Sequence, residues 1–257
     1  MRTGVEVVNA SIDIRSLNFR YPDGTLALCD VSFCVAEGEC VGLLGPNGSG
    51  KSTLLRHLNG ILPERLPTDN GAVLIEGSAV TPQTVSAVRR RAGLLFQDPD
   101  DQLFCSTVSE DVAFGPGQLG LSADDVEKRV REALAQVGLS DLSGRPPHHL
   151  STGEKRRACL AGVLACSPGI LVLDEPTSGL DPRGRRELMA LLTAIPATKL
   201  IATHDLELVV ELCPRSVILD RGRVVADGST RTLLNDEPLM LAHGLERPHV
   251  LQHSHPH

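Results

Sequence analysis

The sequence of 257 residues has few aromatic side chains, with no tryptophan, one tyrosine and five phenylalanines. It also lacks an uncharged apolar run long enough to span a bilayer, because the longest candidate, 159–173, is interrupted by Ser167-Pro168-Gly169. The first residues show no charged-then-apolar signal pattern. We therefore expect a globular chain that does not cross a membrane itself, although it can dock on a protein that does.

Basic tracts and paired cysteines are missing as well. The formal net charge is -7 and no Lys/Arg stripe is present, which disfavours nucleic acid as the main ligand. The seven cysteines are odd in number and scattered, and none forms a Cys-x-x-Cys pair. This pattern predicts reduced thiols in a cytosolic protein rather than a disulfide framework or a zinc site.

What is present is the alternation of strands and helices of an α/β chain. Residues 11–39 alternate around the turn 21–24, which predicts an antiparallel pair with one buried face. Further strands are expected at five stretches, 41–44, 72–76, 92–96, 170–173 and 200–203, with a hairpin at 217–226. The stretch 110–137 is predicted to be mainly helical, as a lobe inserted into the sheet-forming part.

The first chemical motif is Gly45-Pro46-Asn47-Gly48-Ser49-Gly50-Lys51-Ser52, which fits G-x-x-x-x-G-K-[ST] between an apolar strand and a helix. Its glycines let backbone N–H groups converge on phosphates, and Lys51 is expected to reach the β- and γ-oxygens. Ser52 is expected to offer its hydroxyl to Mg²⁺, with Thr53 beside it. The motif predicts a nucleoside-triphosphate site that uses ATP and Mg²⁺.

A second motif is the apolar strand ending in Asp174-Glu175. Asp174 is predicted to hold Mg²⁺, and Glu175 to polarise the attacking water. Alone, such a pair commonly ends a strand in solvent, but the phosphate loop makes that interpretation much weaker here.

In the order of these motifs the chain resembles the ATP-binding-cassette ATPase family over nearly its whole length. The resemblance implies a P-loop core with an antiparallel β-subdomain and an inserted α-helical subdomain. It implies an adenine-stacking role for Tyr21, a Mg²⁺- and γ-phosphate-sensing role for Gln97, a contact with the facing subunit for Asp181 in 178–181, and a switch role for His204. Each has a plainer alternative: Tyr21 packing on a hairpin, Asp181 capping a helix, and His204 as an ordinary strand-end histidine.

The stretch LSTGEKRR, 150–157, resembles the signature LSGGQ of that family with two departures, Thr152 and Glu154, while Ser151 and Gly153 are kept. The resemblance implies that these four residues bind the ATP of a second copy or of a related ATPase, in a homodimer or heterodimer. Ser151-x-x-Glu154 also fits a capping box, with Thr152 at the first helical position. Glu154 brings a negative charge near a phosphate unless the Ser151 N–H holds it back.

The acidic stretch 96–104, followed by 109–116, resembles the ATPases of energy-coupling-factor transporters, especially the cobalt/nickel branch. By composition alone the stretch is a solvated loop or a weak divalent-ion site. The resemblance implies a transmembrane coupling subunit with a basic helix that docks there, a substrate-binding membrane subunit, and a peripheral position on the cytoplasmic face of the cell membrane. A vitamin importer, a soluble ATPase without a membrane partner and a poorly hydrolysing regulatory subunit remain alternatives.

We expect three parts: the ATP-binding core in 1–97 and 157–235, the helical subdomain in 98–156, and a flexible tail in 236–257. The tail loses periodicity and carries five of the nine histidines, His243, His249, His253, His255 and His257. Such a tract either binds transition-metal ions or is a disordered end, and its composition does not separate the two.

Overall fold

The structure is a computed structural model that describes residues 10–68 and 71–246, and it contains two sheets. The six-stranded sheet has the order β10-β9-β3-β8-β7-β6, and the four-stranded antiparallel sheet has the order β2-β1-β4-β5. The strands of the first are β3 (Cys40–Leu44), β6 (Ala92–Leu95), β7 (Ile170–Asp174), β8 (Thr198–Ala202), β9 (Arg215–Asp220) and β10 (Arg223–Ser229). Those of the second are β1 (Ala10–Arg20), β2 (Leu26–Ala36), β4 (Val73–Ile75) and β5 (Ser78–Ala79). The predicted α/β class and the strand positions are confirmed.

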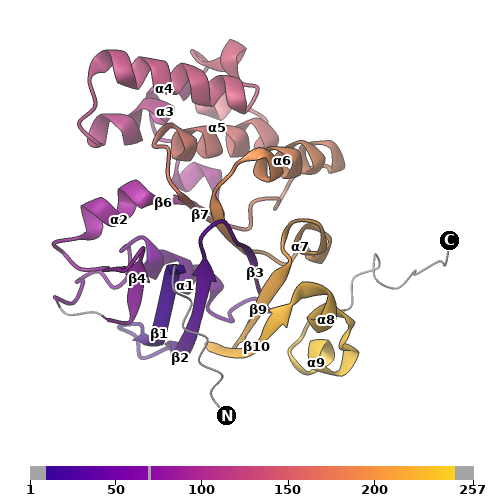
Figure 1. Cartoon of the computed structure of the whole chain (residues 1–257). Coiled ribbons are helices and arrows are strands. Elements are labelled where there is room, and N and C mark those ends of the chain that lie inside the picture. Colours follow the sequence, from indigo (N-terminus) through magenta and orange to yellow (C-terminus); the bar gives the residue numbers. More distant parts are fainter. Residues whose placement is uncertain (1–9, 69–70, 247–257) are drawn as a thin grey trace.

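Helices surround these sheets, and three of them form a lobe above the six-stranded sheet in Figure 1. The lobe consists of α3 (Val108–Gln118), α4 (Ala123–Gln136) and α5 (Thr152–Ala165). The other helices are α1 (Lys51–Leu58), α2 (Val85–Arg91), α6 (Pro182–Ala194), α7 (Leu206–Leu212), α8 (Thr230–Asn235) and α9 (Glu237–Ala242). Polar caps begin several of them: Thr107 and Glu110 form a capping box at α3, and Ser122 accepts a bond from the Asp125 N–H at α4.

The parallel strands β3, β7 and β8 lie in the middle of the six-stranded sheet, where both faces are covered. All five residues of β7 and of β8 are buried, which agrees with the apolar runs 170–173 and 200–202 that they contain. Because β3 pairs in parallel with β8, and β8 with β7, the carboxyl ends of the three strands meet at one edge of the sheet. The segments that follow these strands therefore lie side by side.

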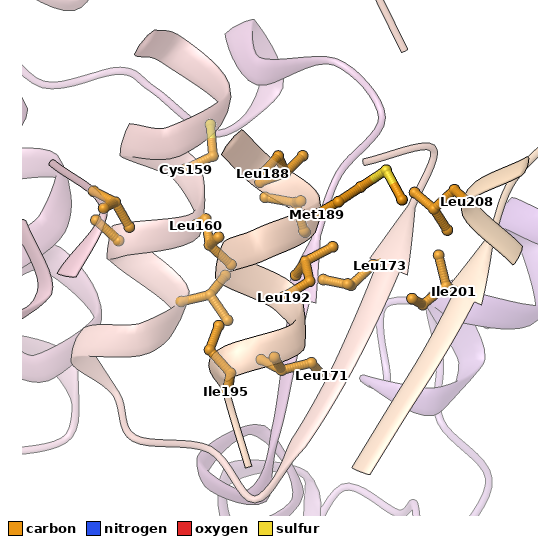
Figure 2. Packing of buried hydrophobic residues seen from close by; sticks show 14 of the residues in the cluster. Cys159, Leu160, Leu171, Leu173, Leu188, Met189, Leu192, Ile195, Ile201 and Leu208 are labelled. Atoms are coloured by element: carbon orange, nitrogen blue, oxygen red, sulfur yellow. The ribbon is translucent and has the colours of Figure 1, made fainter. Parts of the chain in front are cut away.

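Two hydrophobic clusters hold the fold together, one on each face of this sheet. The first joins the sheet to α5, α6 and α7, and Figure 2 shows Leu160 of α5 and Leu192 of α6 near Leu171 and Leu173 of β7. The second packs α1 and the antiparallel sheet against the opposite face. Buried residues of α3 and α4 belong to the first cluster, so the helical lobe shares the core of the sheet instead of having a separate one.

Two of the expected boundaries fall at helices in the structure. Helix α5 runs without a break through position 156, so the limit between 98–156 and 157–235 cuts a continuous helix. The segment 236–257 does not lose regular structure at its start, because Asp236 caps α9 and Met240 of that helix is fully buried. Within residues 10–68 and 71–246, no helix has both the length and the apolar character that crossing a bilayer needs.

Candidate functional site

The glycine-rich loop lies between β3 and α1, as the motif predicts. Gly45 has φ 150° and a Cβ there would lie 2.0 Å from the carbonyl oxygen of Leu219, so only glycine fits. The ammonium group of Lys51 donates to the carbonyl oxygens of Gly45 (2.7 Å) and Pro46 (3.1 Å). Burial lowers the pKa of Lys51, while the nearby carboxylates of Glu175 and Asp174 oppose that shift. The Lys51 ammonium group is thus bonded to the backbone of its own loop.

A cleft of about 390 Å³ opens in front of this loop. It is lined by the predicted residues Tyr21, Asn47, Gly48, Ser49, Gly50, Lys51, Ser52, Thr53, Gln97, Asp174, Glu175 and His204, together with Thr25, Leu26 and Ala27. The last three, from the antiparallel sheet, were not foreseen from the sequence, because small and apolar hairpin residues carry no chemical signal. The structure therefore gathers the predicted residues from five separate segments into one cleft.

Tyr21 reaches this cleft from the end of β1. Its hydroxyl lies 2.9 Å from the Thr53 hydroxyl of α1, and its ring packs edge-on against Phe19 at a centroid distance of 4.9 Å. Both contacts fix the ring at the cleft wall, so Tyr21 does more than pack on the hairpin. A ring held in this way can stack on a planar base.

Asp174 ends β7 beside the loop and is buried. Its Oδ1 has no hydrogen-bond partner in the described residues, which is rare for a buried carboxylate. Burial raises the pKa of Asp174, and a hydrogen bond from Ser52 opposes the shift. An unpartnered oxygen next to a hydroxyl fits Mg²⁺, which takes one or two protein ligands and completes its shell with phosphate oxygens and water. Asp174 and Ser52 are the residues that fit such an ion.

Glu175 takes a conformation that a continuing strand does not allow. Its φ is 46°, a region that non-glycine residues seldom occupy outside functional sites. Its N–H donates to the carbonyl of Ala202 (2.8 Å), and its Oε2 accepts from Thr203 Oγ1 (3.1 Å) and from the His204 N–H (3.3 Å). Nδ1 of His204 lies 2.8 Å from the same oxygen. The three side-chain contacts all fall on Oε2, and Oε1 stays available for a further partner.

Asp205, which follows His204, was not singled out from the sequence. Arg185 of α6 donates to both of its carboxylate oxygens (2.6 and 2.9 Å), and Thr177 Oγ1 donates to Oδ2 (3.1 Å). Burial acts to raise the pKa of Asp205, but the bonds from Arg185 and from the Leu208 N–H outweigh it and the pKa is lowered. This contact connects the turn that holds His204 to α6. The sequence alone gives no sign of it, because Arg185 and Asp205 come together only in the folded chain.

The signature residues Ser151, Thr152, Gly153 and Glu154 do not line the cleft of their own chain. They form the start of α5, where the capping box is confirmed: Glu154 Oε2 accepts from the N–H and from the hydroxyl of Ser151, both at 2.8 Å. The predicted restraint of Glu154 against the Ser151 N–H is therefore present. Ser151 is exposed at the surface.

Asp181 also lies away from the cleft. It caps α6 by accepting a bond from the Gly184 N–H (2.8 Å), so its plainer alternative is met, while its exposed position keeps a contact with a second chain open. The preceding loop passes close to α5, because a Cβ built on Gly179 would lie 3.6 Å from Thr152 Cγ2.

The acidic stretch after Gln97 forms the short 3-10 helix Pro99–Asp101. Asp98 caps it, and Asp100 pairs with Lys155 of α5 (2.6 Å), so two of the three carboxylates already have partners. Beside it a groove of about 350 Å³ carries two exposed rings, Phe104 (64% exposed) and Phe114 (49%), which stack edge to face at 4.9 Å. The surface is therefore more apolar than the run of aspartates predicts.

The histidines of the tail are placed only in part. Nδ1 of His243 lies 2.9 Å from Asp220 Oδ2, so this histidine docks on the end of β9. His249, His253, His255 and His257 lie outside the described residues. In the part of the chain that the structure describes, no three His, Cys, Asp or Glu side chains are grouped to hold a metal ion.

A strand, a glycine-rich loop with its lysine, and a strand-end carboxylate beside a serine together define a P-loop nucleoside triphosphatase. Comparison with known proteins narrows this class. A family model described as ABC transporter matches residues 28–178, and the chain belongs to this family.

Relatives agree with this assignment. A putative ABC transporter ATP-binding protein of Streptomyces coelicolor is 53% identical over 93% of this chain and 90% of its own length. The energy-coupling factor transporter ATP-binding protein EcfA of Carboxydothermus hydrogenoformans is 46% identical over 94% and 88%. The solved structure of cbiO1 from Clostridium perfringens, described as part of the ABC transporter complex cbiONQ, has a TM-score of 0.77 at 36% identity and covers 95% of this chain and 98% of that one.

The chain is thus an ABC ATPase, which binds ATP with Mg²⁺ and hydrolyses it. Members of this family dimerise and work with membrane subunits.

Proposed function

We propose that the chain is the ATPase of an energy-coupling-factor importer that powers uptake of a transition-metal ion, cobalt or nickel, through membrane partner subunits. The observation that carries the importer role is the apolar groove with Phe104 and Phe114, whose wall includes Phe96, the sequence neighbour of the cleft residue Gln97. The likeness to EcfA and to cbiO1 supports it. The chain then sits on the cytoplasmic face of the cell membrane, held there by its partners.

Within this proposal Glu175 acts as the base that orients and deprotonates the attacking water through its Oε1. His204 and Thr203 hold the carboxylate in place through Oε2. Lys51 leaves the carbonyls of its own loop to donate to the β- and γ-phosphates, and Tyr21 stacks on adenine. Mg²⁺ on Asp174 and Ser52, with Gln97 nearby, supplies charge neutralisation when bound.

The site is completed by a second chain. Ser151 is exposed and lies outside its own cleft, while α5 presents an N-terminus, the end of a helix that favours anions. In a homodimer or a heterodimer with a related ATPase, we place the start of α5 on the γ-phosphate of the facing chain. Asp181 then lies at the dimer contact.

The partner of the groove is a helix of a transmembrane coupling subunit that brings apolar side chains to Phe104 and Phe114 and a basic residue to the acidic stretch. Asp101 lines this groove and makes no ion pair within the described residues, so it is the carboxylate available to such a residue. A substrate-binding membrane subunit completes the importer.

Catalysis is tested by Glu175→Gln, with Glu127→Gln on the exposed face of α4 as the matched control. A positioned base contributes about a hundredfold or more to turnover, so we expect Glu175→Gln to bind ATP normally and to hydrolyse it at least about a hundredfold more slowly. The control should keep the parent rate. Hydrolysis by Glu175→Gln at the parent rate rules out the proposed base.

Docking is tested by co-purification of the chain with its membrane partners. Phe114→Asp should reduce recovery of the complex, whereas Leu241→Asp, which changes an even more exposed apolar side chain on α9, should not. Both variants should keep the ATPase rate of the free chain. Full recovery with Phe114→Asp would place the partner on another surface.

The cargo is tested by uptake into ATP-loaded vesicles that contain the complex. We expect labelled cobalt or nickel ions to enter with the parent chain and not with Glu175→Gln. Uptake of a vitamin instead would keep the importer and replace the metal. Salt-sensitive nucleic-acid binding without any partner would favour a soluble ATPase.

A further inference from the structure

Arg156 lies one turn into α5 and is almost completely buried, with 2% of its surface exposed. A guanidinium group is seldom buried to this degree without a carboxylate partner. Within the described residues Arg156 makes no ion pair, and the atoms that receive its hydrogen bonds are backbone carbonyl oxygens. Its Nε has no hydrogen-bond partner among these residues either. Burying this charged group costs desolvation free energy, so we expect a function that requires an arginine here.

Its three hydrogen bonds reach two different loops of the ATP cleft. One terminal nitrogen donates to the carbonyls of Phe96 (2.9 Å) and Gln97 (2.7 Å), and the other donates to the carbonyl of Ser178 (3.2 Å). The first loop carries the side chain of Gln97 into the cleft. The second follows Glu175 directly, since the Ser178 N–H donates to the Glu175 carbonyl (3.1 Å) and Asp181 stands at its end.

These backbones also enclose a hollow of about 380 Å³ between Gln97 and Asp174, with Ser178 on its wall. Arg156 does not line this hollow itself, but it donates to three residues of its wall, Phe96, Gln97 and Ser178. Its pKa is lowered by burial, and the carboxylates of Asp98, Asp174 and Glu175 counteract part of this effect. The guanidinium thus interacts electrostatically with the carboxylates of the site, but it makes no hydrogen bond to any of them.

We propose that Arg156 is a positioning residue for ATP hydrolysis. It links the helix whose N-terminus binds the partner's nucleotide to the backbone of Gln97 and to the loop 178–181, so that these three parts move as one unit. This inference rests on the proposed roles of Ser151, Gln97 and Glu175. A rotation of α5 toward a facing ATP then carries Gln97 and the dimer loop with it, and both halves of the site close together.

The shape of the side chain explains why arginine stands here. Only a planar fork donates in two directions at once, to a carbonyl pair and to a third carbonyl on another loop. Lysine keeps the charge but concentrates its donors at one point. Methionine fills similar volume and donates nothing.

The test compares Arg156→Met, Arg156→Lys and the control Arg129→Met in the full chain. Arg129 also donates to a helix-end carbonyl, that of Ala165, but at the opposite end of α5. Loss of hydrogen bonds from a charged group lowers turnover by about tenfold to a hundredfold if they act on the transition state. We expect this loss in kcat for Arg156→Met with little change in KM for ATP, partial recovery in Arg156→Lys, and no loss in Arg129→Met.

Parent-like kcat in Arg156→Met overturns the proposal. So does an equal fall of kcat and melting temperature in Arg156→Met and Arg129→Met, which marks a role in stability alone. If Arg156→Met does not fold, Arg156→Gln replaces it with the same expectations. Glu175→Gln is measured alongside: an active Glu175→Gln rejects the proposed site, whereas an inactive one with a fully active Arg156→Met rejects only the role of Arg156.

Discussion

Replacing Glu154 perturbs the start of α5 in a way that the structure makes quantitative. Its Oε2 accepts two bonds of 2.8 Å from Ser151, and its N–H donates to Ser151 Oγ at 3.3 Å. A cap of this kind contributes about 1 kcal/mol, and less when it is exposed to solvent. For a chain of this size such a loss lowers the melting temperature by about 2–4 °C. We expect this shift in thermal melts of Glu154→Ala at neutral pH.

The effect should depend on pH with a defined sign. Hydrogen bonds from the Ser151 N–H and hydroxyl lower the pKa of Glu154 below its ordinary value. A carboxyl with a lowered folded-state pKa stabilises the fold above its unfolded pKa of about 4.3, and this contribution is lost as the pH falls through the folded value. The difference between the parent and Glu154→Ala should therefore disappear in acid. A difference that persists there refutes the assignment to the carboxylate.

The same bond bears on turnover. The Ser151 hydroxyl donates to Glu154, so it must turn away before it can donate to a phosphate of the facing chain. A neutral amide holds the hydroxyl less firmly and removes a negative charge, so Glu154→Gln should raise steady-state ATP hydrolysis by about twofold to fivefold, as expected for about 0.5–1 kcal/mol. Glu127→Gln is the control. A fall in rate refutes this reasoning, and a much larger gain marks a site that Glu154 weakens.

Four further substitutions have expected outcomes that rest on single positions. Ser151→Arg should block ATP-driven dimerisation in size-exclusion chromatography, because its bulk covers the N-terminus of α5, whereas Thr152→Gly should change turnover only modestly, since Thr152 already has ordinary helical geometry. Leu192→Ala should lower the free energy of unfolding by about 2–5 kcal/mol in denaturant titration, because Leu192 is fully buried. Asp205→Asn should lower turnover and thermal stability near neutral pH, because it weakens the Arg185 contact. The stability difference should vanish as the pH falls through the lowered pKa of Asp205. A melting temperature equal to that of the parent at neutral pH contradicts this.

Local patterns in the sequence predicted most of the framework. The loop 45–52, the buried strand before Asp174 and the capping box at Ser151 each depend on neighbours within a few residues, so their spacing is visible in one dimension. The antiparallel pair in 11–39 is readable for the same reason, since alternation reports one buried face. The helix α9 was not foreseen for the opposite reason, because Met240 is buried in a cluster of residues from distant parts of the chain.

The contacts that the sequence did not predict join residues far apart in the chain, and no local sequence pattern marks them. Arg156 bonds to backbone carbonyls 60, 59 and 22 positions away, and any residue type offers such a carbonyl. Arg185 and Asp205 are 20 positions apart and meet because α6 packs against α7, the helix that Asp205 caps. The φ of 46° at Glu175 is equally hidden, since glutamate has no preference for that region.

The contacts around Glu175 bear on when ATP hydrolysis can begin. Its carboxylate is held by Thr203 and His204 at one oxygen, and the backbone after it is held by Arg156 through Ser178. The proposed base is therefore already positioned before ATP binds. A single chain would then hydrolyse ATP, unless the start of α5 on the opposing chain is needed to position the γ-phosphate. That start is exposed and does not line its own cleft. With Glu175 as the proposed base, we expect hydrolysis to depend on the closure of two chains and not on the formation of the base, which is the dependence that the proposed importer needs to couple hydrolysis to its membrane subunits.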